Sequence, residues 1–115
     1  MKRKPNETEV ARYADMLAAM GTAPRLRIVR LLLSSHPEGM VVGEIQGELG
    51  IPGSTLSHHL DKLKNEGLVS VRRERQYLRY AANTDALRRL LAFLYEECCS
   101  RSSAIRSDEI IHLKR

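Results

Sequence analysis

The stretch VVGEIQGELGIPGSTLSHHLDKLKNEGLVSVRRERQYLRYAAN, residues 41–83, decides the fold. Its first half carries apolar residues at helical spacing, and its second half carries them at alternate positions. Residues 43–49 are predicted to form a short helix that Gly50 ends. After a turn, Ser54 is predicted to cap a second helix, which Gly67 stops.

Two short strands follow these helices. The segments 68–74 and 76–81 alternate apolar and polar residues, and they are predicted to pair as a hairpin that turns near Glu74 and Arg75. Helix, turn, helix and two-stranded hairpin, in this order, make a winged helix-turn-helix. The expected fold class is therefore mainly α with a small β-hairpin, in the order α-α-α-α-β-β-α, with the helix-turn-helix at 43–66 and the wing at 68–81.

The second helix of the motif has two distinct faces. At 100° per residue, its leucines at positions 56, 60 and 63 fall within about 40° of one another and predict a buried stripe. Polar side chains lie opposite, and small hydroxyl residues near a helix start suit the DNA major groove. The predicted DNA-binding residues on this helix are Ser54, Thr55, Ser57, His58 and Lys62, and those on the wing are Arg72, Arg73 and Arg75.

The charge of the chain gathers in the same region. The formal net charge is +5. Residues 62–79 hold six Lys or Arg against two Glu, which gives +4 (6 − 2) within this segment. Such a concentration favours a surface that meets phosphates, although a solvated face or a protein contact could also carry it. Adjacent His58 and His59 point about 100° apart on a helix, so we expect groove contact for His58 and local packing for His59.

Helices are predicted on both sides of the motif. One runs from Asn6 or Thr8 to about residue 20, a second from Thr22 to about residue 35, and a last one from 85 to about 100. The second carries so many apolar residues that it is expected to have little solvent face. The first and last have apolar stripes that one small domain of 115 residues cannot fully cover. We therefore expect a homodimer joined by residues 7–20 and 85–100 of a single domain, 1–115.

Residues 41–83, together with APRLRIVRLLL at 23–33, resemble the ArsR/SmtB family of metal-responsive winged-helix repressors. Ser-x-His-His-Leu, Glu-Gly-Leu-Val and the arginine-rich wing carry the resemblance in combination. It implies a dimeric repressor bound to double-stranded operator DNA. Arg75 stands where the family usually has glycine, which predicts a wider turn at the wing tip. Gln46 replaces a small residue of the family, which predicts looser packing in the short helix.

The two cysteines, Cys98 and Cys99, stand side by side near the end of the last predicted helix. From the residues alone, Cys98 could be a small core residue and Cys99 incidental. LLAFLYEECC also resembles an arsenic-responsive group of the family, although the third cysteine of that group is missing. The resemblance implies trivalent arsenic, as arsenite or an organoarsenical, bound at Cys98 and Cys99 as inducer, with no cofactor required. Zinc, which Asp108 and His112 could help to bind, another thiophilic metal and thiol oxidation remain alternatives.

Several functional classes of protein are not expected. The sequence shows no nucleophile with its base, no phosphate-binding glycine loop and no catalytic metal set, so we expect no enzyme. It has no apolar run near the about 20 residues of a membrane span and no export signal, and it has only two cysteines, which favours the cytoplasm. A winged-helix module for protein contacts and a small dithiol redox protein remain the competing interpretations.

Overall fold

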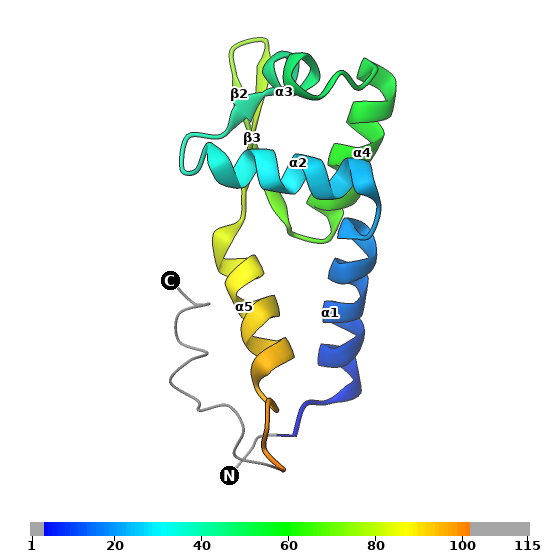
Figure 1. Cartoon of the computed structure of the whole chain (residues 1–115). Helices are drawn as coiled ribbons and strands as arrows, with labels where there is room; N and C mark the ends of the chain where they lie inside the picture. The colour runs from blue at the N-terminus through cyan, green and yellow to red at the C-terminus, as the bar shows by residue number, and fades with distance from the viewer. Residues whose placement is uncertain (1–3, 102–115) are drawn as a thin grey trace.

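The computed structural model describes residues 4–101 and shows five helices and three short strands within them (Figure 1). Two helices, α1 and α5, extend side by side from one end of a compact part that holds the other elements. The elements are α1 (Glu7–Met20), α2 (Ala23–Ser34), β1 (Met40–Val41), α3 (Val42–Leu49), α4 (Gly53–Asn65), β2 (Val69–Glu74), β3 (Tyr77–Ala82) and α5 (Thr84–Tyr95). The predicted winged helix-turn-helix is confirmed, with one strand more than expected.

The helix-turn-helix consists of α3, a short turn and α4. At the start of α3, the Glu44 carboxylate accepts a hydrogen bond of 3.0 Å from the Val41 N–H. Gly50 ends α3 as predicted: with φ at 65°, it takes the left-handed conformation and donates its N–H to the Gln46 carbonyl at 2.8 Å. Gln46 itself is exposed, so it does not loosen the interior of this helix.

The core forms where α4 meets α1, α2, α3 and the sheet. The three leucines of the predicted α4 stripe, Leu56, Leu60 and Leu63, are at most 1% exposed. Burial of a leucine side chain contributes about 1.5–3 kcal/mol, so this stripe fixes α4 against the domain. The other fully buried large side chains are Met16, Ile28, Leu32, Ile45 and Leu68.

The sheet has the order β1-β3-β2, and β1 was not predicted. In this strand, Met40 pairs with Tyr80 and adds a third strand to the wing hairpin beside β3. Gly39 makes this pairing possible. Its φ is +77°, and a Cβ at this position would lie 2.2 Å from the Tyr80 carbonyl oxygen, so only glycine allows the chain to approach β3 so closely.

Helix α2 is more exposed to solvent than predicted. Thr22 caps α2 as expected, and Ile28, Val29 and Leu32 are buried. Leu26 and Leu33, however, are 49% and 40% exposed, so the prediction of almost no solvent face was wrong. The two leucines lie seven residues apart on the side of α2 that faces away from α4 and the sheet.

The helices α1 and α5 contact each other through stacked rings. Tyr13 and Phe93 lie with ring centroids 4.4 Å apart. Asn6 caps α1 by accepting the Glu9 N–H at 2.7 Å, as predicted. The apolar stripes of both helices stay exposed in the single chain, because Val10, Leu17, Leu91, Leu94 and Tyr95 are 37–51% exposed. No helix within residues 4–101 has the length and apolar character needed to cross a membrane.

The last helix ends earlier than predicted, at Tyr95 instead of about residue 100. Beyond it, the Cys98 N–H donates to the Tyr95 carbonyl at 2.8 Å, which closes a tight four-residue turn. Cys99 then takes a φ of 61°, which no right-handed helix can accommodate. The prediction that the cysteines stand near the end of this helix was therefore wrong, because they lie in the turn that follows it.

Candidate DNA interface and cysteine pair

The exposed side of α4 carries the five residues predicted to contact DNA. All of them, Ser54, Thr55, Ser57, His58 and Lys62, are exposed in the structure. The buried leucine stripe lies on the opposite side of the same helix. The structure therefore brings the predicted helix residues together on one outward surface.

The start of α4 differs from the prediction that Ser54 caps it. The helix begins at Gly53 with Pro52 at the N-cap, and no side chain accepts a capping hydrogen bond there. Proline can hold the extended backbone that an N-cap needs without a side-chain acceptor. As a result, the Ser54 hydroxyl lies in the first turn and is not used for capping, so it is available to a phosphate or a base edge.

The two histidines of α4 have different surroundings. His58 is exposed on the outward surface, whereas His59 is half-buried beside α2. The His59 Nδ1 atom lies 3.4 Å from Nη1 of Arg25. Burial, together with the nearby charges of Arg25, His58 and Lys62, lowers the pKa of His59 below 6.5. His59 is therefore held neutral next to a guanidinium, which fits the predicted packing role and not a groove contact.

Glu74 on the wing forms ion pairs with two of the wing arginines. Glu74 accepts from Arg72 at 2.6 Å and from Arg79 at 2.9 Å. These two bonds lower the pKa of the Glu74 carboxyl. Arg72, which was predicted to face DNA, is therefore already paired. The prediction did not include Glu74 or Arg79, although the antiparallel register that sets Arg72 opposite Arg79 brings the three side chains onto one face.

The wing tip is a two-residue turn at Arg75 and Gln76. The expectation of a wider turn was wrong, because Arg75 adopts the left-handed conformation itself, with φ at 61°. Arg73 donates from Nη1 to the Arg75 carbonyl at 3.3 Å. Both side chains are exposed, and the Arg75 guanidinium forms no hydrogen bond or ion pair with residues 4–101. The charge of Arg75 is therefore available to a phosphate of DNA.

The cysteine pair lies in the turn after α5, away from α4 and the wing. Both thiols are half-buried, and their sulfur atoms are 3.3 Å apart. Glu97, Cys99, Ser100 and Arg101 line an open depression of about 420 Å³ beside them. Within the described part of the chain, no group of three or more His, Cys, Asp and Glu side chains is placed to hold a metal ion. Asp108 and His112, considered as zinc ligands, lie outside the described residues.

Comparison with known proteins identifies relatives of this chain. The model of the family described as "Bacterial regulatory protein, arsR family" matches residues 24–71. The nodulation protein NolR of Rhizobium meliloti is 32% identical over 108 residues, which cover 94% of this chain and 84% of NolR. The transcriptional activator HlyU of Vibrio cholerae is 30% identical over 99 residues, which cover 86% of this chain and 89% of HlyU.

Solved structures of proteins with similar sequences have a similar fold. The structure of reduced HlyU from Vibrio cholerae has a TM-score of 0.61 and 37% identity, and the match covers 77% of this chain and 94% of HlyU. The transcriptional repressor BigR of Xylella fastidiosa has a TM-score of 0.62 and 29% identity, with 81% and 92% covered. HlyU is named as a transcriptional activator and BigR as a transcriptional repressor, so both are transcriptional regulators. Together with the outward surface of α4 and the basic wing, they show that this chain belongs to the ArsR family and is a DNA-binding transcriptional regulator.

Proposed function

We propose that this protein is a homodimeric repressor that leaves its operator when a trivalent arsenical binds Cys98 and Cys99. The observation that carries the proposal is the approach of the two sulfur atoms to 3.3 Å in an accessible turn. Trivalent arsenic is thiophilic and prefers three ligands in a pyramid. Two protein thiolates leave its third position to a methyl or aryl group, a small thiol or water, which favours an organoarsenical at least as much as arsenite.

We also propose that the protein represses transcription and does not activate it. The relatives include both an activator, HlyU, and a repressor, BigR, so family membership alone leaves the direction open. The resemblance of residues 23–33 and 41–83 to metal-responsive repressors favours repression. We expect the protein to act in the cytoplasm, where its operator DNA lies.

The dimer is expected to form through α1 and α5. Both helices carry exposed apolar side chains that a second copy of the chain can cover: Val10 and Leu17 on α1, and Leu91, Leu94 and Tyr95 on α5. Two α4 helices related by the dimer axis would then read half-sites about 34 Å apart.

The cysteine pair cannot block DNA directly, because it lies beyond α5. The stacked Tyr13 and Phe93 connect α5 to α1, and Met16 of α1 lies in the same core as Leu63 of α4. A ligand that changes the geometry of the dimer helices would move the two α4 helices out of register with successive major grooves. This is a coupling between distinct sites, and typical couplings of about 1–3 kcal/mol weaken DNA binding roughly 5- to 150-fold.

Thiol oxidation is the second candidate. A disulfide between the two sulfur atoms would require them to approach from 3.3 Å to about 2.05 Å, with loss of two protons and two electrons to an external oxidant. One of the similar structures is of HlyU in its reduced form. The titration described next distinguishes thiol oxidation from arsenical binding.

The test is an operator-release titration on duplex DNA selected by the protein from random sequences. Arsenite, a methylated trivalent arsenical, antimonite, zinc and hydrogen peroxide are compared by fluorescence anisotropy. We expect release by the arsenicals with the native chain, and operator binding without release for Cys98→Ser and Cys99→Ser. Ser100→Ala, from the same depression, is the matched control and should respond like the native chain. Release of the double serine variant by arsenicals would refute the assignment, and release only by peroxide would favour oxidation.

A further inference from the structure

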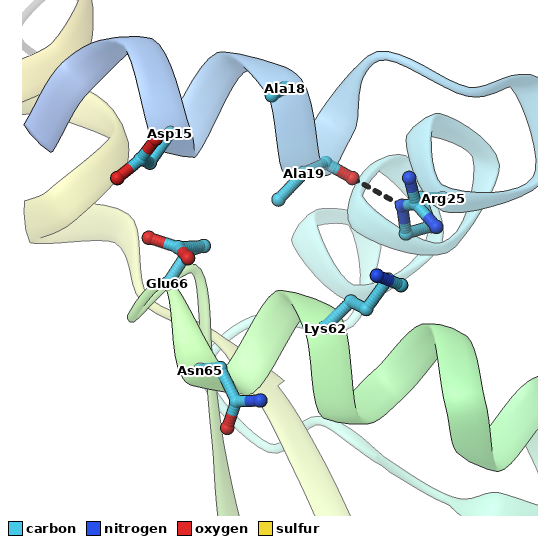
Figure 2. Close-up of a pocket in the computed structure, with 7 residues that line it drawn as sticks. All are labelled: Asp15, Ala18, Ala19, Arg25, Lys62, Asn65 and Glu66. Atoms are coloured by element: carbon cyan, nitrogen blue, oxygen red, sulfur yellow. Dashed lines mark hydrogen bonds between the residues drawn. The ribbon is translucent and has the colours of Figure 1, made fainter. Parts of the chain in front are cut away.

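A polar pocket lies between the dimer helix α1 and the outward side of α4, separate from the cysteine pair and from the wing. It has a volume of about 370 Å³, which falls in the range of small-molecule sites. Figure 2 shows its lining, which comes from the second half of α1, the first turn of α2 and the end of α4. The lining residues are Asp15, Ala18, Ala19, Arg25, Lys62, Asn65 and Glu66.

The charges in this pocket are separated. The carboxylates of Asp15 and Glu66 lie at one end, and the cationic groups of Arg25 and Lys62 lie at the other (Figure 2). None of these four side chains forms an ion pair with another residue in the described part of the chain. The pocket therefore presents two negative and two positive groups that do not neutralise each other.

The basic end is held in place before any ligand binds. The Arg25 Nε atom donates to the Ala19 carbonyl at 2.5 Å (Figure 2). The Nη1 atom of Arg25 lies 3.4 Å from Nδ1 of His59. These contacts leave Nη2 available to a further acceptor. A guanidinium fixed in this way loses less side-chain entropy when it binds a carboxylate, which favours binding.

We propose that this pocket binds a small zwitterion with one carboxylate and one ammonium group on a short chain. The carboxylate of the ligand would contact Arg25 and Lys62, and its ammonium would contact Asp15 and Glu66. The methyl side chains of Ala18 and Ala19 leave room for the carbon atoms between them. A ligand with only one of the two charges would leave one end of the pocket uncompensated.

The site stays accessible in the proposed dimer and borders the DNA surface. Asp15 lies about 140° around α1 from Val10, which belongs to the exposed apolar surface. Lys62 is exposed at the edge of the outward side of α4 and was predicted to contact DNA. A bound carboxylate and a DNA phosphate would therefore compete for Lys62, so the ligand would weaken DNA binding without involving the cysteines.

The experiment uses the full-length protein without DNA and follows amide NMR shifts of residues 15–19 and 62–66. The probes are glycine, β-alanine and γ-aminobutyrate, each with its singly charged acid and amine analogues, at up to about 10 mM. We expect saturable shifts with at least one zwitterion and binding of its analogues that is about tenfold or more weaker. Absence of shifts with all three zwitterions, or equal binding of the acid analogue, would overturn the proposal.

Variants link the signal to the pocket. Lys62→Met and Glu66→Gln should each weaken zwitterion binding about tenfold, whereas Lys64→Met, a charge loss on the same helix outside the pocket, should not. Ala18→Leu, at an exposed position, should fill the pocket and abolish binding in a folded protein. With the native chain, a saturating zwitterion should flatten the salt dependence of DNA binding by about one unit per protomer. An unchanged DNA affinity would overturn the competition for Lys62.

Discussion

The wing tip offers the sharpest test of the DNA interface, through the substitution Arg75→Gly. Arg75 holds a φ of 61°, a conformation that costs an L-residue about 1–2 kcal/mol and costs glycine little. Glycine removes the guanidinium and keeps the two-residue turn, together with the backbone carbonyl that Arg73 contacts. The substitution thus separates the charge of the wing tip from its shape.

The expected loss can be worked out from the number of phosphate contacts. Each contact changes the slope of log K against log salt by about 0.9, so one Arg75 on each of two wings contributes about 1.8. If the protein is the proposed dimer, the native protein should therefore lose about 12-fold more affinity than the Arg75→Gly variant between 50 and 200 mM salt. The folded state should be as stable as the native one or more stable by up to about 1 kcal/mol, because the loss of strain is partly offset by the greater backbone entropy of unfolded glycine.

Arg72→Met is the matched comparison. The Arg72 guanidinium is already bound to Glu74 at 2.6 Å, so its removal should change the salt slope by less than half as much as Arg75→Gly. The assay is fluorescence anisotropy of a labelled duplex titrated at several salt concentrations, with thermal unfolding by circular dichroism at fixed protein concentration as the folding control. Equal slopes for the two variants, or an unchanged slope for Arg75→Gly in a folded protein, would refute this account of the wing.

Three further predictions address the dimer, the histidine and the sheet. Leu17→Glu places a charge in the exposed apolar surface of α1 and should yield a monomer with weaker DNA binding, measurable by sedimentation at micromolar concentration. Because the pKa of His59 is lowered in the folded state, its contribution to stability is complete above pH 6.5 and declines as the pH falls from there toward the folded pKa. In urea unfolding, His59→Gln should remove this pH dependence, and His58→Gln should not. Gly39→Ala should lower the free energy of unfolding by more than about 2 kcal/mol, because its Cβ meets the Tyr80 carbonyl, and a smaller loss in urea unfolding would contradict the close approach.

The sequence by itself determined the order of the helices and the motif they form. The leucine spacing of α4 identified its buried stripe, since helical geometry alone puts positions 56, 60 and 63 on one side. Asn6, Thr22 and Gly50 marked helix ends correctly, because capping depends on local hydrogen bonds. The polar residues opposite the stripe then had to be exposed, and this gave the candidate DNA surface without knowledge of the tertiary structure.

Tertiary structure alone decided the features that join distant parts of the chain. The strand β1 exists because Gly39 lets residue 40 approach Tyr80, forty positions away. Glu74 pairs with Arg79 only because the hairpin register brings Arg79 to the face of β2 that carries Glu74. Periodicity reports which side of an element is buried, but not which partner covers it, and these contacts depend on the partner.

The same distinction applies to the two proposed ligand sites. The two adjacent cysteines are visible in the sequence, but only the structure shows that α5 ends at Tyr95 and that both cysteines lie in the turn beyond it. The pocket of Asp15, Arg25, Lys62 and Glu66 has no sequence signature, because its residues come from three helices and none is unusual in its own segment. The local interactions of a helix involve only residues close together in the sequence. The opposite charges meet around one cavity only because α1 and α2 pack against α4.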